Sequence, residues 1–138
     1  MAYSGFLIKV GSFEIPLSWM RAETYSVGLH GQDLDSYRDA DGILHRQALE
    51  NVVPKVEFNT PAMKKRAEFA EFMGNIRANY TNATEKKVLA TVYVPEIDDY
   101  VTQDMYVPDI TPSIYLANDK DIWYNEIRIA FIGYGGKA

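Results

Sequence analysis

Four aspartates in the first third of the chain are the first candidates for binding a metal ion. They are Asp33, Asp35, Asp39 and Asp41. If Asp39 and Asp41 take positions three and five of a calcium-binding loop, Gly42 falls at position six, where such loops need glycine. Position one is then Tyr37 and position twelve is Ala48, although the loop needs a carboxylate at both. Because both anchoring positions fail, we predict neither a metal site nor a cofactor.

The two histidines of the chain, His30 and His45, border the same acidic segment and could support acid–base or nucleophilic catalysis. A His–Asp pair can be drawn here. However, the sequence has no Gly-x-Ser-x-Gly turn and no third residue in an order typical of a catalytic triad. Two solvent-facing histidines explain the sequence better.

A second acidic group, formed by Glu96, Asp98 and Asp99, could suggest the paired carboxylates of a glycosidase. Asp98 and Asp99 are adjacent, so on a strand they point to opposite faces and cannot flank one glycosidic bond. Glu96 and Asp98 could share a face, yet a solvated turn explains them better. We therefore predict that the protein is not an enzyme.

Three consecutive cations, Lys64, Lys65 and Arg66, lie near the predicted start of a helix. The positive end of the helix dipole disfavours cations at that position. One interpretation is contact with an acidic neighbouring subunit, and the alternative is long side chains that extend into water. We predict subunit contacts.

Composition limits the classes of protein that remain. With 138 residues, of which 47% are hydrophobic and 13% aromatic, the chain has the size and content of one domain, expected to span residues 1–138. The net charge of -5 is opposite in sign to what phosphate contacts need, so we expect no sequence-specific nucleic-acid partner. The chain has no cysteine and no apolar run of transmembrane length, so we expect neither disulfides nor a membrane partner.

Charge and tyrosine content both favour a protein that assembles. Residues 55–87 hold seven basic side chains against four acidic ones, whereas residues 88–121 hold seven acidic ones against one lysine. Opposite patches of this kind could pair between copies in a ring or a stack, although a solvated surface with local clustering is the alternative. Ten tyrosines exceed what a small core needs, and tyrosine is enriched at interfaces.

The segment from Val52 to Tyr80 predicts a strand that leads directly into the one clear helix of the chain. Residues 52–59 alternate in the manner of a half-buried strand. Thr60 is then predicted as the N-cap and Pro61 as the first helical residue. The apolar residues that follow recur every three or four positions on one face: Phe69, Phe72, Met73, Ile76 and Tyr80. A helix over about 60–80 with such a face must cover an open side of a sheet.

Further strands are predicted from alternation between apolar and polar residues. They comprise a hairpin between Gly5 and Pro16 and strands over residues 23–28, 86–95, 100–107, 113–116 and 123–133. Residues 86–95 are almost all apolar, so this strand should be central. Because most connections are short, we expect antiparallel pairing. The predicted class is mainly β (α+β), with an antiparallel β-sandwich or partly closed barrel and one α-helix.

The least regular segment lies between Leu29 and Leu44, where glycine, aspartate and serine are frequent. Asp41 and Gly42 predict a hairpin turn, with residues 36–39 leading out and residues 43–47 returning. So long an excursion in a small domain is usually functional or an interaction arm, although a disordered surface loop is the alternative.

Three stretches carry a resemblance to a known family. They are residues 3–11 (YSGFLIKVG), 31–46 (GQDLDSYRDADGILHR) and 56–61 (VEFNTP). The chain resembles a small uncharacterised family encoded by tailed bacteriophages and prophages of Gram-positive bacteria. Its layout is also similar to the tail-tube-like fold of tail-tube, distal-tail and tail-completion proteins, which form rings, commonly of six subunits. The resemblance implies that residues of about 29–46 form an arm that reaches a neighbouring subunit.

This resemblance implies a structural virion protein of a long flexible phage tail, which self-assembles into a ring at or near the tip as a distal-tail or baseplate hub-like protein. The alternatives are a tail tube or tail terminator (completion) protein. A host-surface carbohydrate-binding module is an alternative of another class, and an exposed Trp19 or Trp123 would support it.

The resemblance also implies partners and contact residues. The partners would be other copies in a hexamer, together with tube, tape-measure and tail-associated hub proteins, assembled in the host cytoplasm into the virion tail. The expected subunit contacts are Tyr37, Arg38, Asp39 and Asp41 in the arm, and Lys64, Lys65 and Arg66 near the helix.

Overall fold

The computed structural model describes residues 3–33, 37–45 and 48–135, which contain thirteen strands and one α-helix. The main sheet comprises β1 (Ile8–Val10), β2 (Phe13–Glu14), β3 (Ser26–Asp33), β6 (Ala48–Asn59), β8 (Tyr80–Asn82), β9 (Lys87–Val94), β10 (Asp99–Tyr106) and β13 (Arg128–Gly133). The other elements are the 3-10 helix η1 (Leu17–Trp19), β4 (Tyr37–Arg38), β5 (Leu44–His45), β7 (Lys64–Lys65), α1 (Arg66–Arg77), β11 (Ile114–Ala117) and β12 (Ile122–Tyr124).

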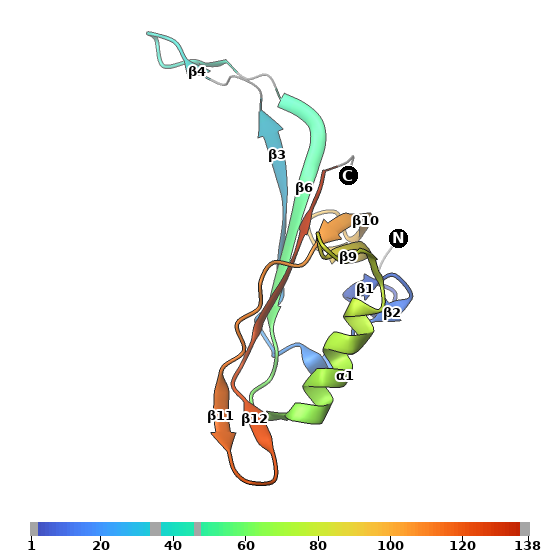
Figure 1. The fold of residues 1–138 in the computed structure, drawn as a ribbon. Helices are drawn as coiled ribbons and strands as arrows, with labels where there is room; N and C mark the ends of the chain where they lie inside the picture. The colour runs from blue at the N-terminus through green and yellow to red at the C-terminus, as the bar shows by residue number, and fades with distance from the viewer. Residues whose placement is uncertain (1–2, 34–36, 46–47, 136–138) are drawn as a thin grey trace.

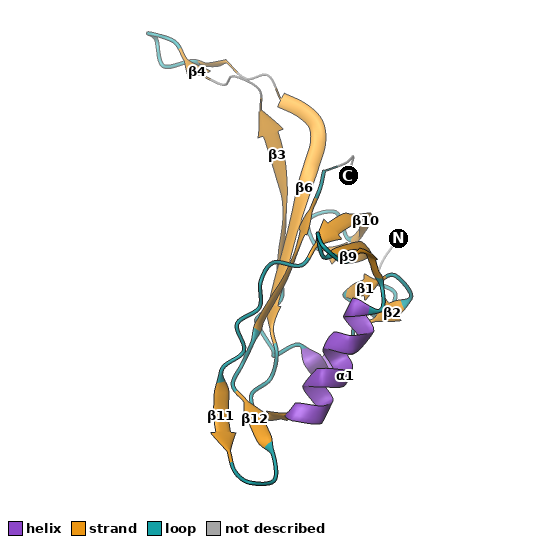
Figure 2. Ribbon diagram, in the orientation of Figure 1, coloured by secondary structure: helices purple, strands orange, loops and turns teal. Residues whose placement is uncertain are grey.

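Strand pairing is antiparallel throughout the described residues. The main sheet has the order β2-β1-β9-β10-β13-β6-β3, and β8 pairs with β9 beside it. The strands β11, β12 and β7 form a second sheet, and β4 pairs with β5. Since β2 and β3 are at opposite ends of the order and do not pair with each other, the sheet does not close into a barrel. The predicted β-rich antiparallel fold with one helix is confirmed (Figure 2).

The main sheet has two parts that cross each other, and the hydrophobic core lies at the crossing. Figure 1 shows β3, β6 and β13 as one long ribbon, with β1, β2, β9 and β10 beside its middle and α1 packed below them. The strand β13 joins the parts because it pairs with β6 over five residues and with β10 over two. The large, fully buried side chains come from both parts, from the helix and from the segment after β2: Ile8, Val10, Ile15, Val56, Phe58, Ile76, Val88, Val92, Val94, Met105, Ile129 and Phe131. Burial of this shared apolar surface stabilises the crossing.

The helix covers the sheet as predicted, but it begins later than the sequence indicates. Residues 60–63 precede β7, and α1 runs only from Arg66 to Arg77. Thr60 does not cap a helix: its N–H donates to the Ile127 carbonyl over 2.9 Å, and its Oγ1 accepts from the Ile127 N–H over 3.0 Å. The prediction of Thr60 as N-cap and Pro61 as first helical residue was therefore wrong, because the backbone of Ile127 provides the hydrogen-bond partners of Thr60 instead.

Three other boundaries differ from the sequence expectations. The strand expected to end at Gly28 continues as β3 to Asp33, because β6 pairs with it along that length. The long final strand is divided, since β12 pairs with β7 whereas β13 pairs with β6. The helix ends before Tyr80, which instead begins β8 opposite Val88.

Candidate subunit interface

A two-stranded ribbon projects from one end of the main sheet. The last pair between β13 and β6 is Ile132 with Lys55, and from Pro54 outward β6 pairs only with β3. Proline tolerates such a position because no third strand needs its missing N–H. We call residues 29–33 and 48–54 the arm ribbon and residues 37–45 the arm tip. Figure 1 shows them reaching well beyond the rest of the molecule.

The arm tip is a small hairpin with its own internal contacts. Tyr37 on β4 stacks on His45 of β5, with ring centroids 4.9 Å apart and planes 12° apart. The Arg38 guanidinium donates to the Gly42 carbonyl over 2.8 Å. Gly42 has a φ of 81°, which glycine adopts without strain, so the predicted turn at Asp41 and Gly42 is confirmed. Part of the predicted segment, residues 34–36 and 46, lies outside the described residues.

Asp39 organises this tip. Its Oδ1 accepts from the N–H groups of Asp41 and Ile43 over 3.0 and 3.1 Å, and its Oδ2 lies 2.9 Å from Nε2 of His45. The hydrogen bond from His45, followed by those from the backbone, lowers the pKa of Asp39 below its usual value. The carboxylate therefore fixes the shape of the turn, and the His–Asp pair acts as a brace for the hairpin.

Apolar side chains at the tip face solvent. Tyr37 is 60% exposed, Ile43 is 58% exposed and Leu44 is 43% exposed. Exposed aromatic and aliphatic residues at the end of a projecting element are typical of a surface that another protein covers. Ile43 and Leu44 were missed from the sequence, although two aliphatic residues directly after a turn are a signal that could have found them.

The arm ribbon is anchored at its base by a buried amide. Gln103 of β10 is only 7% exposed, and its Nε2 donates to the Val52 carbonyl over 3.2 Å. Its Oε1 accepts from the Gly135 N–H over 3.1 Å. Gln103 therefore joins the arm ribbon, β10 and the segment after β13, which holds the ribbon in one direction relative to the core.

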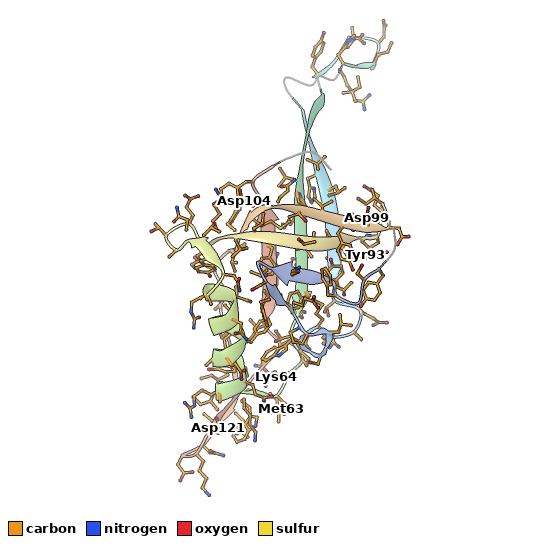
Figure 3. All side chains as sticks on the ribbon, turned by 90° about the vertical axis from the view of Figure 1, so that its right-hand side faces the viewer. Met63, Lys64, Tyr93, Asp99, Asp104 and Asp121 are labelled. Atoms are coloured by element: carbon orange, nitrogen blue, oxygen red, sulfur yellow. The ribbon has the colours of Figure 1, made fainter. Side chains whose placement is uncertain are left out.

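The three basic residues predicted as subunit contacts lie far from the arm, at the opposite end of the molecule (Figure 3). Lys64 places its Nζ 4.6 Å from the centre of the Trp19 ring. The Lys65 N–H donates to Oε1 of Glu68 over 3.1 Å, and Arg66 Nε lies 3.7 Å from Oδ1 of Asp121. These residues and the arm tip thus form two separate surfaces.

Neither tryptophan forms the exposed shelf that would support sugar binding. Trp19 is buried and stacks on Phe72 of α1, with ring centroids 4.3 Å apart. Trp123 is half-buried in β12, where it pairs with Lys65 of β7. The Trp19 ring therefore contributes to the core.

Two kinds of feature are absent from the described residues. No cluster of three or more histidine, aspartate or glutamate side chains within these residues is arranged to hold a metal ion. No helix in the same part of the chain is long and apolar enough to cross a membrane.

A profile described as "Family of unknown function (DUF6711)" matches residues 1–134. The chain belongs to this family. No curated protein sequence matches the chain.

Two solved structures contain chains with the same fold as this family member. One, described as "Virion of native gene transfer agent (GTA) particle", superposes with a TM-score of 0.53 at 14% identity and covers 96% of this chain and 92% of that one. Another, described as "Tail of empty GTA particle computed with helical refinement, C6 symmetry", has a TM-score of 0.51 at 17% identity and covers 99% of both chains. These superpositions confirm the predicted tail-tube-like fold.

Proposed function

We propose that the chain is a structural subunit of a long flexible phage tail, which assembles with copies of itself into a ring, commonly of six, at or near the tail tip. The observation that carries this proposal is the full-length match to a chain from a tail with C6 symmetry, combined with the projecting arm. The proposed work is mechanical, and the partners beyond itself are tube, tape-measure and tail-associated hub proteins. The virion tail, assembled in the host cytoplasm, is the proposed location.

The arm tip is proposed as one contact between subunits. Its exposed Tyr37, Ile43 and Leu44 offer apolar area, and Arg38 and Asp41 beside them offer charge. Asp39 contributes indirectly, because its carboxylate holds the tip in shape before contact is made. A preformed hairpin loses little conformational freedom on binding, which favours association. The cluster of Lys64, Lys65 and Arg66 is proposed as a second contact.

Substitution at the tip tests this contact. In Arg38→Glu and Ile43→Asp variants of the full chain, we expect rings to be lost while circular dichroism shows folded monomers. Leu17→Asp is the matched control, because Leu17 is also an exposed aliphatic residue but lies in η1, outside the arm. Rings of unchanged size in sedimentation of both tip variants would show that the arm does not join subunits.

A tail tube subunit is the second candidate function. It is favoured by the match to a tail determined with helical refinement, since a tube is a stack of rings. Negative-stain imaging separates the two candidates: a tip protein stays as single rings at high concentration, whereas a tube protein forms stacks.

A further inference from the structure

A groove lies beside the C-terminal end of α1. Its volume is about 490 Å³, and its lining combines apolar side chains with two cations: Met73, Arg77, Tyr80, Ala83, Lys86, Val107, Pro108 and Ile110. Lys86 Nζ lies 3.0 Å from Oδ1 of Asp109, a side chain that projects almost fully into water. Such an exposed ion pair is weak, so Lys86 can engage another acidic partner. We call this feature the basic groove.

An exposed turn of opposite charge connects β9 and β10. Ile97 is 43% exposed between Glu96 and Asp98. The turn is held by the Ile97 N–H on the Val94 carbonyl and by Tyr93, whose hydroxyl donates to Oδ1 of Asp98 over 2.6 Å. We call residues 95–99 the acidic turn. It presents one aliphatic side chain among carboxylates on a preformed backbone.

The groove and the turn lie at opposite ends of the same pair of strands. Lys87 pairs with Tyr106 at the groove end, and Val94 pairs with Asp99 at the turn end. At about 3.3 Å per residue, β9 separates the two surfaces by roughly 25 Å. Figure 3 shows Asp99 at the end of β9 and β10 that is remote from α1. One molecule therefore cannot bring its own turn into its own groove.

We propose that the acidic turn of one copy docks into the basic groove of the next copy. This inference rests on the proposed ring assembly and adds a further pair of contacting surfaces to it. Ile97 enters between Met73 and Ile110, while the carboxylates beside it face Arg77 and Lys86. Two different complementary patches on opposite ends of a molecule make a head-to-tail contact, and a head-to-tail contact closes into a ring when the rotation permits.

Because the natural chain has no cysteine, engineered disulfides test the contact directly. The full-length Ala83→Cys, Ile97→Cys variant places one thiol in the groove wall and one on the turn. Under mild oxidation we expect a ladder of covalent oligomers that ends at the closed ring, since a disulfide needs Cα atoms within about 7 Å. The Leu17→Cys, Ile97→Cys control keeps the turn thiol and moves its partner to another exposed site, so it should stay monomeric on denaturing gels.

Charge reversal provides a second readout. Arg77→Glu and Glu96→Arg should each raise the concentration needed for half-assembly by about tenfold, and the two together should restore assembly. Glu14→Arg, on the exposed edge of β2, should leave assembly unchanged. If wild-type rings form but the groove–turn pair cross-links no better than its control, this inference is overturned and the proposed function stands. A wild-type chain that remains monomeric at every concentration overturns both.

Discussion

Gln103 and Val52, which are 51 positions apart in the sequence, are joined by a hydrogen bond of 3.2 Å from the buried Gln103 amide to the Val52 carbonyl. The same side chain also accepts from the Gly135 N–H. Gln103 therefore ties the arm ribbon to β10 and to the segment after β13. If the arm joins subunits, this bond fixes the geometry of the contact.

Replacement of this amide should weaken the base of the arm. Gln103→Leu keeps a similar volume but removes two partly buried hydrogen bonds, to the Val52 carbonyl and from the Gly135 N–H, so we expect a loss of about 1–2 kcal/mol in the free energy of unfolding. Urea denaturation measures the change. Thr102→Ser, at the exposed neighbouring position, keeps the hydroxyl that lies 2.9 Å from Oγ1 of Thr91 and should stay within about 0.5 kcal/mol. Equal losses in the free energy of unfolding at the two positions would show that the hydrogen bonds of Gln103 do not stabilise the base of the arm.

Two glycines should respond to alanine in opposite directions. At Gly133 an added Cβ would lie 2.6 Å from Cδ of Pro54 and 2.7 Å from Oε1 of Gln103, so we expect Gly133→Ala to cost about 1–3 kcal/mol through overpacking. At Gly74, in the middle of α1, an added Cβ meets nothing within 4 Å. Gly74→Ala should therefore stabilise by up to about 1 kcal/mol. Thermal unfolding of both variants measures the difference, and a stable Gly133→Ala protein would contradict the packing at the arm base.

Thr60 provides a test of why the helix starts late. Thr60→Val retains the shape of the side chain but leaves the buried Ile127 N–H without its acceptor. We expect a loss of about 1–3 kcal/mol in stability, with the helical signal in circular dichroism of the folded protein unchanged. Thr60→Ser, which keeps the hydroxyl, should retain more stability than Thr60→Val. A loss of helical signal instead would mean that Thr60 caps the helix after all.

The arm tip should resist acid. The folded pKa of Asp39 is lowered chiefly by the hydrogen bond from His45, so its contribution is present above the ordinary aspartate pKa of about 3.9. This contribution is lost only as the pH falls through the lowered pKa. Carbon-13 NMR of the Asp39 carboxyl should show a midpoint below 3.9, and His45→Ala should raise it toward that value. A midpoint that is unchanged by His45→Ala would show that the hydrogen bond from His45 does not stabilise the Asp39 carboxylate.

Much of the sheet can be predicted because its signals are local. In β9, Val88, Ala90, Val92 and Val94 alternate with less buried residues, and the structure buries all four on one face. Likewise, the turn at Asp41 and Gly42 is held by contacts within residues 37–45 and is found where the sequence predicts it.

The wrong predictions concern segments whose structure depends on a partner distant in sequence. Thr60 and Pro61 have the local chemistry of a helix start, yet the pairing of Thr60 with Ile127 satisfies the same groups. Residues 29–33 lack alternation, and they become a strand only because β6 lies beside them. Among the predicted subunit contacts, the fold places Lys64 over Trp19, a neighbour 45 positions away that the sequence pattern does not reveal.

The central claim, that this chain closes into a ring with copies of itself, is tested most directly by the mass of the purified wild-type protein in solution. Mass photometry combined with negative-stain imaging should show one discrete ring-shaped particle of about six times the 15.7 kDa chain. A particle that keeps the mass of a single chain at the highest attainable concentration would contradict the account.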